Sequence, residues 1–464
     1  MTNNVEVDMT ADSGVTLGVD VGTSSICVCA VECATAKPIE VATVPNRAGI
    51  SSHGADSCFC ERYGEQDPMT ILETVTGLVN KVRGSLQPEI QGLSLTGQMH
   101  GALLVDCKLR PLSRLITWQD TRALPLLSQI GARLEDIHPE ARGCYVNSGY
   151  MAATLYWFCQ TQTLPESAYR ACFIHDWVRS CLTQERRVIT DPTNAASSGV
   201  FDLRAGDWDW EAIEALGIPT RLFPPVKAST DLAGHTPDGI PVRCGLGDNQ
   251  ASVLGSCATG QETDCAVLNL GTGSQLSLVV DDLEEWREPN ELRPYPGGKY
   301  LLVGASPNGG AVYALVGDFL RAVLDRQGEC LSEEQLFTLM NRLAADAPPG
   351  AAGLKFNPFF YPERGRAAET ASLTGLTDSN FSPANMTRAL LEGVIGILYS
   401  MYCGMGKARS RIVGAGNGIK RNALIQSIVE QVFDLPFAAS PYDEEAAYGA
   451  ALCGAGRSGG KGAV

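Results

Sequence analysis

The spacing of apolar residues predicts two short strands near the start of the chain. Apolar side chains stand at every second position in residues 15–19 and again in residues 26–30, and a small, polar turn at residues 22–25 separates the two stretches. This alternation is typical of strands joined by a tight turn. Asp67 and Pro68 then mark a helix start, which we expect to run to residue 83, and a strand should follow over residues 92–96. Strands that alternate with helices predict an α/β fold.

Residues 269–274 repeat the pattern of residues 20–25 in the second half of the chain. In both places a Gly-Thr turn lies between strand-like stretches, as a duplicated domain would leave it. We therefore expect two related lobes with a cleft between them, over residues 15–256 and 264–455, with flexible ends at 1–14 and 456–464.

The second lobe has its own start and turn signals. Ser382 and Pro383 predict the start of a late helix. A glycine-rich turn over residues 414–418 should join a strand at 411–413 to a helix at 421–433. Residues 446–451 read as a helix of small side chains, which favours close packing over ligand binding.

The first Gly-Thr turn, residues 22–24, is a candidate phosphate site. Its consecutive N–H groups and hydroxyl suit phosphate oxygens, and Asp20 at the end of the preceding strand could hold Mg²⁺. By itself the turn is better explained as an ordinary hairpin. The second Gly-Thr turn, residues 271–273, changes this balance, because two such turns could hold one nucleotide from both sides. Asn269 stands where the first copy has Asp20, so the metal-binding carboxylate belongs to the first half alone.

Asp248 lies in a glycine-bracketed turn before a run of small and apolar residues that reads as a helix. A carboxylate there could accept the proton of a sugar hydroxyl. It could also be the N-cap of the helix, and both roles can hold together.

Two further loops offer polar groups for a sugar. Gln98, Met99 and His100 follow one expected strand, and Trp118 and Asp120 follow another. Polar groups at strand ends beside an aromatic ring suit sugar binding, although core packing explains Trp118 equally well. His175 and Asp176 fit a structural helix cap better than a functional pair.

Charge and composition limit the classes of molecule that the protein can bind. The chain of 464 residues has 36 Lys and Arg against 52 Asp and Glu, a net charge of −16. This argues against nucleic acid and anionic membranes, and means that a bound nucleotide needs N–H groups and a cation. Residues 300–317 carry no charge but are broken by Pro307 and glycines, so they make a poor membrane span. The sixteen cysteines, including Cys58 and Cys60, are scattered, which favours free thiols in a reducing cytoplasm.

The order of these motifs resembles the FGGY carbohydrate kinases, a branch of the actin/hexokinase/Hsp70 superfamily with ribonuclease H-like lobes. The resemblance extends over residues 15–454 and rests on residues 20–24, 97–101, 118–120, 247–249 and 271–272. It implies that Asp248 is the general base and that Asp20 is associated with Mg²⁺. It further implies a nucleotide site of Gly22, Thr23, Ser24, Gly271, Thr272, Gly310, Gly414, Gly416 and Asn417, and a sugar site of Gln98, Met99, His100, Trp118, Asp120 and Asn249.

The resemblance also implies ATP and Mg²⁺ as cofactors and a small ketose as the acceptor, in a monomer or a homodimer. Residues 115–120, 174–176, 191–197 and 306–310 resemble the members that phosphorylate sedoheptulose. Xylulose, ribulose and glycerol are the alternative acceptors, because a sequence does not show pocket depth. A sensor without catalytic activity is also open, although such a protein would be expected to lose Asp20 or Asp248. Gln119, Gly273 and the loop at residues 414–417 depart from the wider family pattern.

Overall fold

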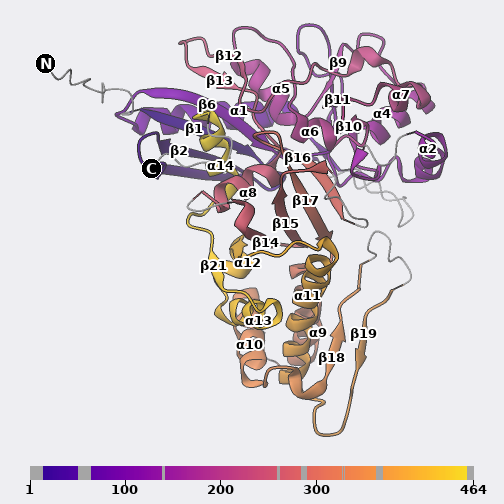
Figure 1. Ribbon diagram of the computed structural model, residues 1–464, viewed down its shortest axis with the longest axis vertical. Helices are drawn as coiled ribbons and strands as arrows, with labels where there is room; N and C mark the ends of the chain where they lie inside the picture. The colour runs from indigo at the N-terminus through magenta and orange to yellow at the C-terminus, as the bar shows by residue number, and fades with distance from the viewer. Residues whose placement is uncertain are drawn as a thin grey trace, which may run out of the picture.

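The computed structural model describes residues 14–50, 64–137, 142–258, 262–283, 290–326, 328, 330–361 and 369–456. Two six-stranded mixed sheets organise the chain, one in each half (Figure 1). The predicted α/β fold with two related lobes is therefore confirmed. Cys58 and Cys60, most of both predicted flexible ends, and residues 259–261 of the predicted boundary lie outside the described residues. The boundary itself stays a prediction.

The first sheet has the strand order β12-β13-β6-β1-β2-β3. Its strands are β1 (Val15–Val21), β2 (Ser25–Glu32), β3 (Pro38–Pro45), β6 (Ile90–Gly97), β12 (Leu232–His235) and β13 (Pro241–Arg243). β1, β2 and β3 form an antiparallel meander, whereas β6 is parallel to β1 and β13 is parallel to β6. The predicted strand pair around the first Gly-Thr turn is β1 and β2.

The second sheet has the order β16-β17-β15-β14-β20-β21. Its strands are β14 (Cys265–Leu270), β15 (Ser274–Val280), β16 (Glu291–Tyr295), β17 (Lys299–Ser306), β20 (Arg411–Ala415) and β21 (Phe437–Ala439). β14, β15 and β17 are again antiparallel neighbours, but β16 comes between β15 and β17 in the chain and pairs with the outer side of β17; β20 and β21 follow β14 in parallel. Each Gly-Thr turn thus joins two antiparallel neighbours, and a parallel strand lies on the other side of the first of them: β6 beside β1, and β20 beside β14. The repeated sequence therefore marks a repeated arrangement of strands.

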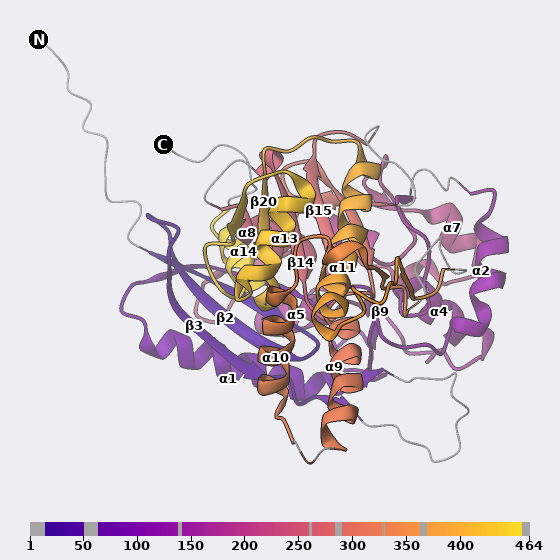
Figure 2. The same ribbon diagram turned by 90° about the horizontal axis from the view of Figure 1, so that it is seen from below.

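Helices and shorter strands complete the two halves. The helices are α1 (Pro68–Ser85), α2 (Leu127–Leu134), α4 (Met151–Gln160), α5 (Ile174–Leu182), α6 (Pro192–Ala196), α7 (Trp210–Ala215), α8 (Asp248–Ser256), α9 (Gly310–Asp325), α10 (Glu333–Asp346), α11 (Pro383–Met405), α12 (Asn417–Lys420), α13 (Ala423–Phe433) and α14 (Glu445–Gly454). The short strands are β4 (Gly49–Ile50), β5 (Glu65–Gln66), β7 (Leu103–Val105), β8 (Leu115–Ile116), β9 (Arg170–Cys172), β10 (Phe201–Asp202), β11 (Asp207–Trp208), β18 (Lys355–Asn357) and β19 (Ser372–Thr374). Helices α9, α10, α11 and α13 gather beyond the second sheet, at one end of the molecule (Figures 1 and 2).

Local signals place the helix starts where the sequence predicts them. The Asp67 carboxylate accepts a hydrogen bond from the Thr70 N–H at the start of α1, and Ser382 caps α11 in the same way. Both helices have proline in their first turn. None of the helices in the described part of the chain is long and apolar enough to cross a membrane.

The last helix, α14, packs in the first half of the molecule, against β1 and α8 (Figure 1). A Cβ atom on Gly18 would lie 1.9 Å from the Ala447 carbonyl oxygen, and one on Gly449 would lie 1.9 Å from that of Ala251. These approaches confirm the close packing predicted for the small-residue helix. Both faces of β1 are therefore buried: the core of the first lobe covers one face, and α14 covers the other.

Candidate active site

A cavity of about 450 Å³ lies where the two halves meet. The first half supplies Asp20, Asp248 and Asn249 to its wall, and the second half supplies Asn269, Gln275, Gly416 and Asn417. Asp20 and Asn269 occupy the same place in equivalent strands, β1 and β14, each next to the last residue. Those strands lead into the Gly-Thr turns, although residues 22–24 and 271–273 do not themselves line the cavity.

Asp248 is the first residue of α8, and Gly247 is the N-cap. The N-cap role considered for Asp248 is therefore wrong, and its carboxylate is not used to close the helix end. Its Oδ1 accepts a local bond from the Asn249 N–H, at 2.7 Å. Burial raises the pKa of Asp248 to about 6, while that N–H group and the charge of Arg293 pull it partly back.

The pKa of Asp20 is raised further than that of Asp248. Burial, with the negative charges of Asp248 and Glu444, raises its pKa to about 8. Asp443 and Glu445 add further carboxylates to the wall, and both pair with Lys420, at 2.8 and 3.2 Å. Because acidic groups dominate this cavity, a polyphosphate entering it needs an accompanying cation.

The chemistry of these groups fits Mg²⁺. The buried Oδ1 of Asp20 has no hydrogen-bond partner among the described residues, so it is available as an oxygen ligand. The described residues contain no cluster of three or more metal-binding side chains. Protein sites for Mg²⁺ commonly use one or two carboxylates, with water and substrate phosphates as the other ligands.

Each Gly-Thr turn has carbonyl oxygens held by protein donors. At the first turn, Asn46 Nδ2 donates to the Gly22 carbonyl and Gln66 Nε2 to that of Thr23, both at 2.9 Å. At the second turn, the N–H groups of Gly310 and Ala311 donate to the carbonyls of Gly271 and Thr272, at 2.9 and 2.8 Å. Gly310 therefore supports the turn through the start of α9. Ser24, Gly271 and Thr272 are exposed.

The expected sugar loop contacts the first turn directly. The Thr23 hydroxyl donates to Gln98 Oε1 at 3.2 Å and accepts from Trp118 Nε1 at 3.1 Å. Trp118 is 48% exposed, so the core-packing explanation for this residue is wrong. Its indole N–H is held by the first Gly-Thr turn, and about half of the residue is exposed to solvent.

His100 and Met99 link this loop to the second half of the first lobe. The His100 ring stacks on Tyr150 with centroids 4.2 Å apart, and its Nδ1 lies 2.8 Å from the Ser197 carbonyl oxygen. Met99 is buried, and its sulfur would lie 2.6 Å from a Cβ atom on Gly247. The sugar loop and the start of the Asp248 helix are therefore in contact.

Asp120 and Asn249 are engaged by protein groups. The Asp120 carboxylate is fully buried, accepts bonds from Arg122 and accepts the Gly64 N–H at 2.9 Å. Its direct contact with a ketose stays a prediction, which this burial disfavours. Asn249 accepts a hydrogen bond from Gln275 of β15, so the residue after Asp248 contacts the other half of the molecule.

The glycine-rich turn divides into two parts. Gly414 lies inside β20, where a Cβ atom would come 2.3 Å from the Phe437 ring, so its glycine serves packing. Gly416 has φ 78°, and its N–H donates to Glu445 Oε1 at 3.3 Å. Asn417 is exposed on the cavity wall.

His175 and Asp176 do not cap a helix, contrary to the prediction. They lie inside the first turn of α5, whose N-cap is Phe173, and both are buried. Asp176 pairs with Arg179 at 2.8 Å, and Arg179 also donates to the Cys244 carbonyl oxygen. This buried pair ties α5 to the chain segment that enters α8.

Several wall residues carry no signal in the sequence. Gln275, Lys420 and Glu445 reach the cavity only because strands and helices from distant segments meet there. Glu444 could have been suspected from its charge beside the small-residue helix, but its left-handed backbone (φ 58°) is a property of the fold. In the sequence repeat Asn269 corresponds to Asp20 and has no predicted role; in the structure both residues line the same cavity.

The fold and the site together define a family. The model of the FGGY family of carbohydrate kinases matches the chain through its N-terminal domain at residues 15–255 and its C-terminal domain at residues 266–457. The chain therefore belongs to the FGGY family of carbohydrate kinases.

Individual relatives span nearly the whole chain. It is 29% identical to the sedoheptulokinase of Mus musculus, over 95% of this chain and 97% of the relative. It is 30% identical to the glycerol kinase of Thermus brockianus, over 86% and 83%. The fold is shared with gluconate kinase from Lactobacillus acidophilus (TM-score 0.82, 21% identity, 95% and 88% covered) and with Plasmodium falciparum glycerol kinase with ADP (TM-score 0.78, 22%, 96% and 90%).

Proposed function

We propose that this carbohydrate kinase transfers the γ-phosphoryl group of ATP to the terminal primary hydroxyl of a ketose, with Asp248 as the general base. One observation carries the proposal. Asp248 and Asp20 of the first half share a single cavity with Asn269, Gln275 and Gly416 of the second half. A site assembled from both halves can bind the nucleotide and the acceptor against each other.

In the transfer, the hydroxyl oxygen of the sugar bonds to the γ-phosphorus as the bond to the β–γ bridging oxygen breaks. The hydroxyl proton passes to the Asp248 carboxylate. Because such transition states are largely dissociative, the carboxylate mainly orients the hydroxyl and takes its proton late. A pKa of about 6 suits this task near neutral pH, since the group is ionised yet basic enough to accept a proton.

Asp20 would hold Mg²⁺ together with the phosphates of ATP. When bound, the ion neutralises charge on the β- and γ-phosphate oxygens. The two Gly-Thr turns would supply N–H groups, and the exposed Thr272 its hydroxyl, toward the same nucleotide, while the Thr23 hydroxyl is bonded to Gln98 and Trp118. Gly416 and Asn417 line the wall where we place the adenosine.

Sedoheptulose is the acceptor that we propose, giving sedoheptulose 7-phosphate. The support is the likeness to the sedoheptulokinases of Mus musculus and Homo sapiens, both 29% identical over most of the chain. Beside the first Gly-Thr turn, the half-exposed Trp118 indole and the partly buried His100 ring are the groups that we place against the sugar, whereas Gln98 is buried with its amide bonded to Thr23 and Gln66. The buried free thiols of the described residues suit a reducing cytoplasm, where we place the reaction.

The direct test is ADP release by the purified protein with ATP, Mg²⁺ and one sugar at a time. Sedoheptulose, xylulose, ribulose, gluconate and glycerol form the panel, and a reaction without sugar is the control. We expect sedoheptulose to give the largest kcat/KM. A larger value for xylulose or glycerol would replace the acceptor but keep the kinase, whereas no stimulation by any sugar would favour a sensor without catalytic activity.

A further inference from the structure

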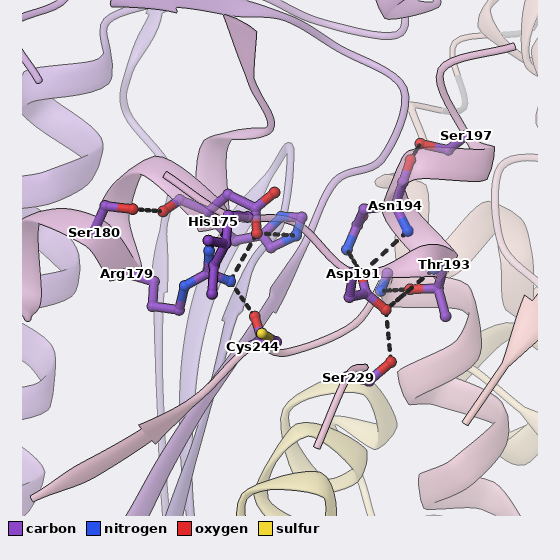
Figure 3. A network of polar contacts seen from close by, with 12 residues as sticks. His175, Arg179, Ser180, Asp191, Thr193, Asn194, Ser197, Ser229 and Cys244 are labelled. Atoms are coloured by element: carbon purple, nitrogen blue, oxygen red, sulfur yellow. Dashed lines mark hydrogen bonds and ion pairs between the residues drawn. The ribbon is translucent and has the colours of Figure 1, made fainter. Parts of the chain in front are cut away.

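A short buried helix lies between the base and the sugar loop. This helix, α6, begins after Asp191, whose carboxylate is fully buried and serves as its N-cap (Figure 3). Asp191 accepts bonds from the N–H and hydroxyl of Thr193, at 3.1 and 2.8 Å, and from Asn194 Nδ2 at 2.7 Å. The Ser229 hydroxyl adds a bond at 2.6 Å. So many partners hold one carboxylate that the helix start is fixed.

Thr193 connects this fixed helix start to the backbone beside the proposed base. Its hydroxyl donates its one proton to Asp191 Oδ2 and accepts the N–H of Gly247 at 2.8 Å. Gly247 is the N-cap of α8 and directly precedes Asp248. Asp191 therefore fixes the orientation of the Thr193 hydroxyl. The oxygen of that hydroxyl in turn holds the Gly247 N–H, and so positions the backbone that carries Asp248.

Ser197, four residues further along, holds the sugar loop. Its hydroxyl donates to the Asn194 carbonyl at 2.7 Å and accepts the His100 N–H at 3.1 Å. Its carbonyl oxygen lies 2.8 Å from His100 Nδ1. Because a carbonyl oxygen only accepts, Nδ1 of a neutral His100 carries the proton and Nε2 is the acceptor nitrogen. The contact also explains why His100 keeps a left-handed backbone, with φ 73°.

We propose that Thr193 and Ser197 are positioning residues that fix the base and the acceptor-binding loop relative to each other. The inference rests on the proposed function of Asp248 and His100. Its physical basis is that transfer requires the attacking oxygen near the phosphorus and the base together, and that a misplacement of about 1 Å can lower a rate by about 100-fold. Neither side chain lines the cavity, so both act through other residues.

The test compares Thr193→Val with Thr193→Ser. Valine removes the hydroxyl and leaves the Gly247 N–H and Asp191 without it, whereas serine keeps both bonds. We expect Thr193→Val to lower kcat by about 10- to 100-fold with the KM for ATP unchanged, and Thr193→Ser to stay within about threefold of the wild type. Thr16→Val is the matched control, because the buried Thr16 hydroxyl has no hydrogen-bond partner in the described part of the chain.

Ser197→Ala should give the complementary pattern. It removes the acceptor of the His100 N–H and keeps the backbone carbonyl, so the KM for the sugar should rise by about five- to tenfold while kcat changes less. A merely structural defect would instead lower the active fraction, and with it kcat, in both variants alike. Equal kcat and KM in Thr193→Val and wild type, with both proteins folded by thermal melting, would overturn the proposal.

A second readout does not depend on catalysis. Hydrogen–deuterium exchange of the peptide covering residues 244–254 should be faster in Thr193→Val than in Thr193→Ser, Thr16→Val or wild type. If the wild type phosphorylates no sugar, the proposed function fails, and this exchange still decides whether α6 holds the start of α8. Identical exchange in all four proteins would overturn the positioning role.

Discussion

At the scale of single residues, the site depends on how burial tunes two carboxylates. Asp248 and Asp20 line the same cavity, and their pKa values are raised to about 6 and about 8. Burial is the main cause for both, and Asp20 also experiences the charge of Asp248. The two groups thereby suit the different tasks that we propose for them: Asp248 would accept a proton near neutral pH, and Asp20 would exchange its proton for a metal ion.

Replacing Asp248 with Asn should separate catalysis from binding. We expect kcat to fall by about 10²- to 10⁴-fold, because the amide cannot take the hydroxyl proton, while the affinity for ATP is kept. The raised pKa means that burying the ionised carboxylate costs free energy, so the variant should melt at the same or a higher temperature at pH 7.5. Steady-state kinetics and thermal melting check this. An effect on kcat below about threefold would mean that another carboxylate is the base.

The rate should depend on pH through the same group. In the proposed role the active form of Asp248 is the carboxylate, so kcat/KM for the sugar should be level above pH 7 and fall as the pH drops through about 6, about tenfold per unit below it. The measurement is a pH profile at saturating Mg²⁺ and ATP. The residual activity of Asp248→Asn serves as control, since it should lack this acidic limb. An identical limb in the variant would assign the titration to another group.

At the scale of elements, the crossing of α8 and α14 connects the cavity wall to the core. α14 begins after Glu444 and contains Glu445 in its first turn, and both line the cavity. The crossing is close because glycines face each other: a Cβ atom on Gly255 would lie 2.2 Å from the Glu445 carbonyl oxygen. Helix α8 carries Asp248 at its other end, so one packing contact sets the positions of acidic groups on two walls.

Gly449→Ala should loosen this crossing. Its added methyl group meets the Ala251 carbonyl oxygen, and overpacking of this kind typically lowers the free energy of unfolding by about 1–3 kcal/mol. The control is Gly396→Ala in α11, where nothing lies within 4 Å of an added Cβ atom and alanine should stabilise the helix by up to about 1 kcal/mol. Denaturant unfolding measures both. Equal stabilities for the two variants would show that α14 can shift without cost.

At the scale of the whole molecule, two lobes of equivalent topology meet around an acidic cavity. Asp20, Asp248, Asp443, Glu444 and Glu445 line it, in a chain whose net charge is −16. Triphosphate adds further negative charge to this region. Contacts such as that between Gln275 and Asn249 bring the lobes together beside the base. We therefore expect that the affinity for the nucleotide and the contact between the two lobes both depend on the cation that accompanies the nucleotide.

ATP should stabilise the protein much more with Mg²⁺ than with a chelator. A ligand at about 100 times its Kd adds about 2.7 kcal/mol to the free energy of unfolding, and without the ion the cavity repels the phosphates. Thermal shift with ATP and either Mg²⁺ or EDTA measures the difference. Asp20→Ala should reduce the increment due to Mg²⁺ and raise the Mg²⁺ concentration needed for activity. An unchanged metal dependence in that variant would contradict the role of Asp20.

Much of the fold could be predicted because the signals are local. Alternating apolar positions, the caps at Asp67 and Ser382, and the repeated Gly-Thr turns each depend on neighbouring residues, and all appear where the sequence predicts them. The exposure of Trp118 and the burial and pairing of His175 and Asp176 could not be predicted in this way. Whether a tryptophan is exposed, or a carboxylate faces an arginine, depends on elements that arrive from elsewhere in the chain.

The sequence by itself determined the α/β class, the duplicated plan and the motif order of an FGGY carbohydrate kinase, since periodicity and turn chemistry act over a few residues. Only the tertiary structure decided that Asp120 is buried against Arg122, that α14 crosses back to the first sheet, and that Asp20 and Asp248 share one cavity. The reason is that burial and the electrostatic field at a carboxylate are sums over groups distant in sequence. They exist only after the chain has folded.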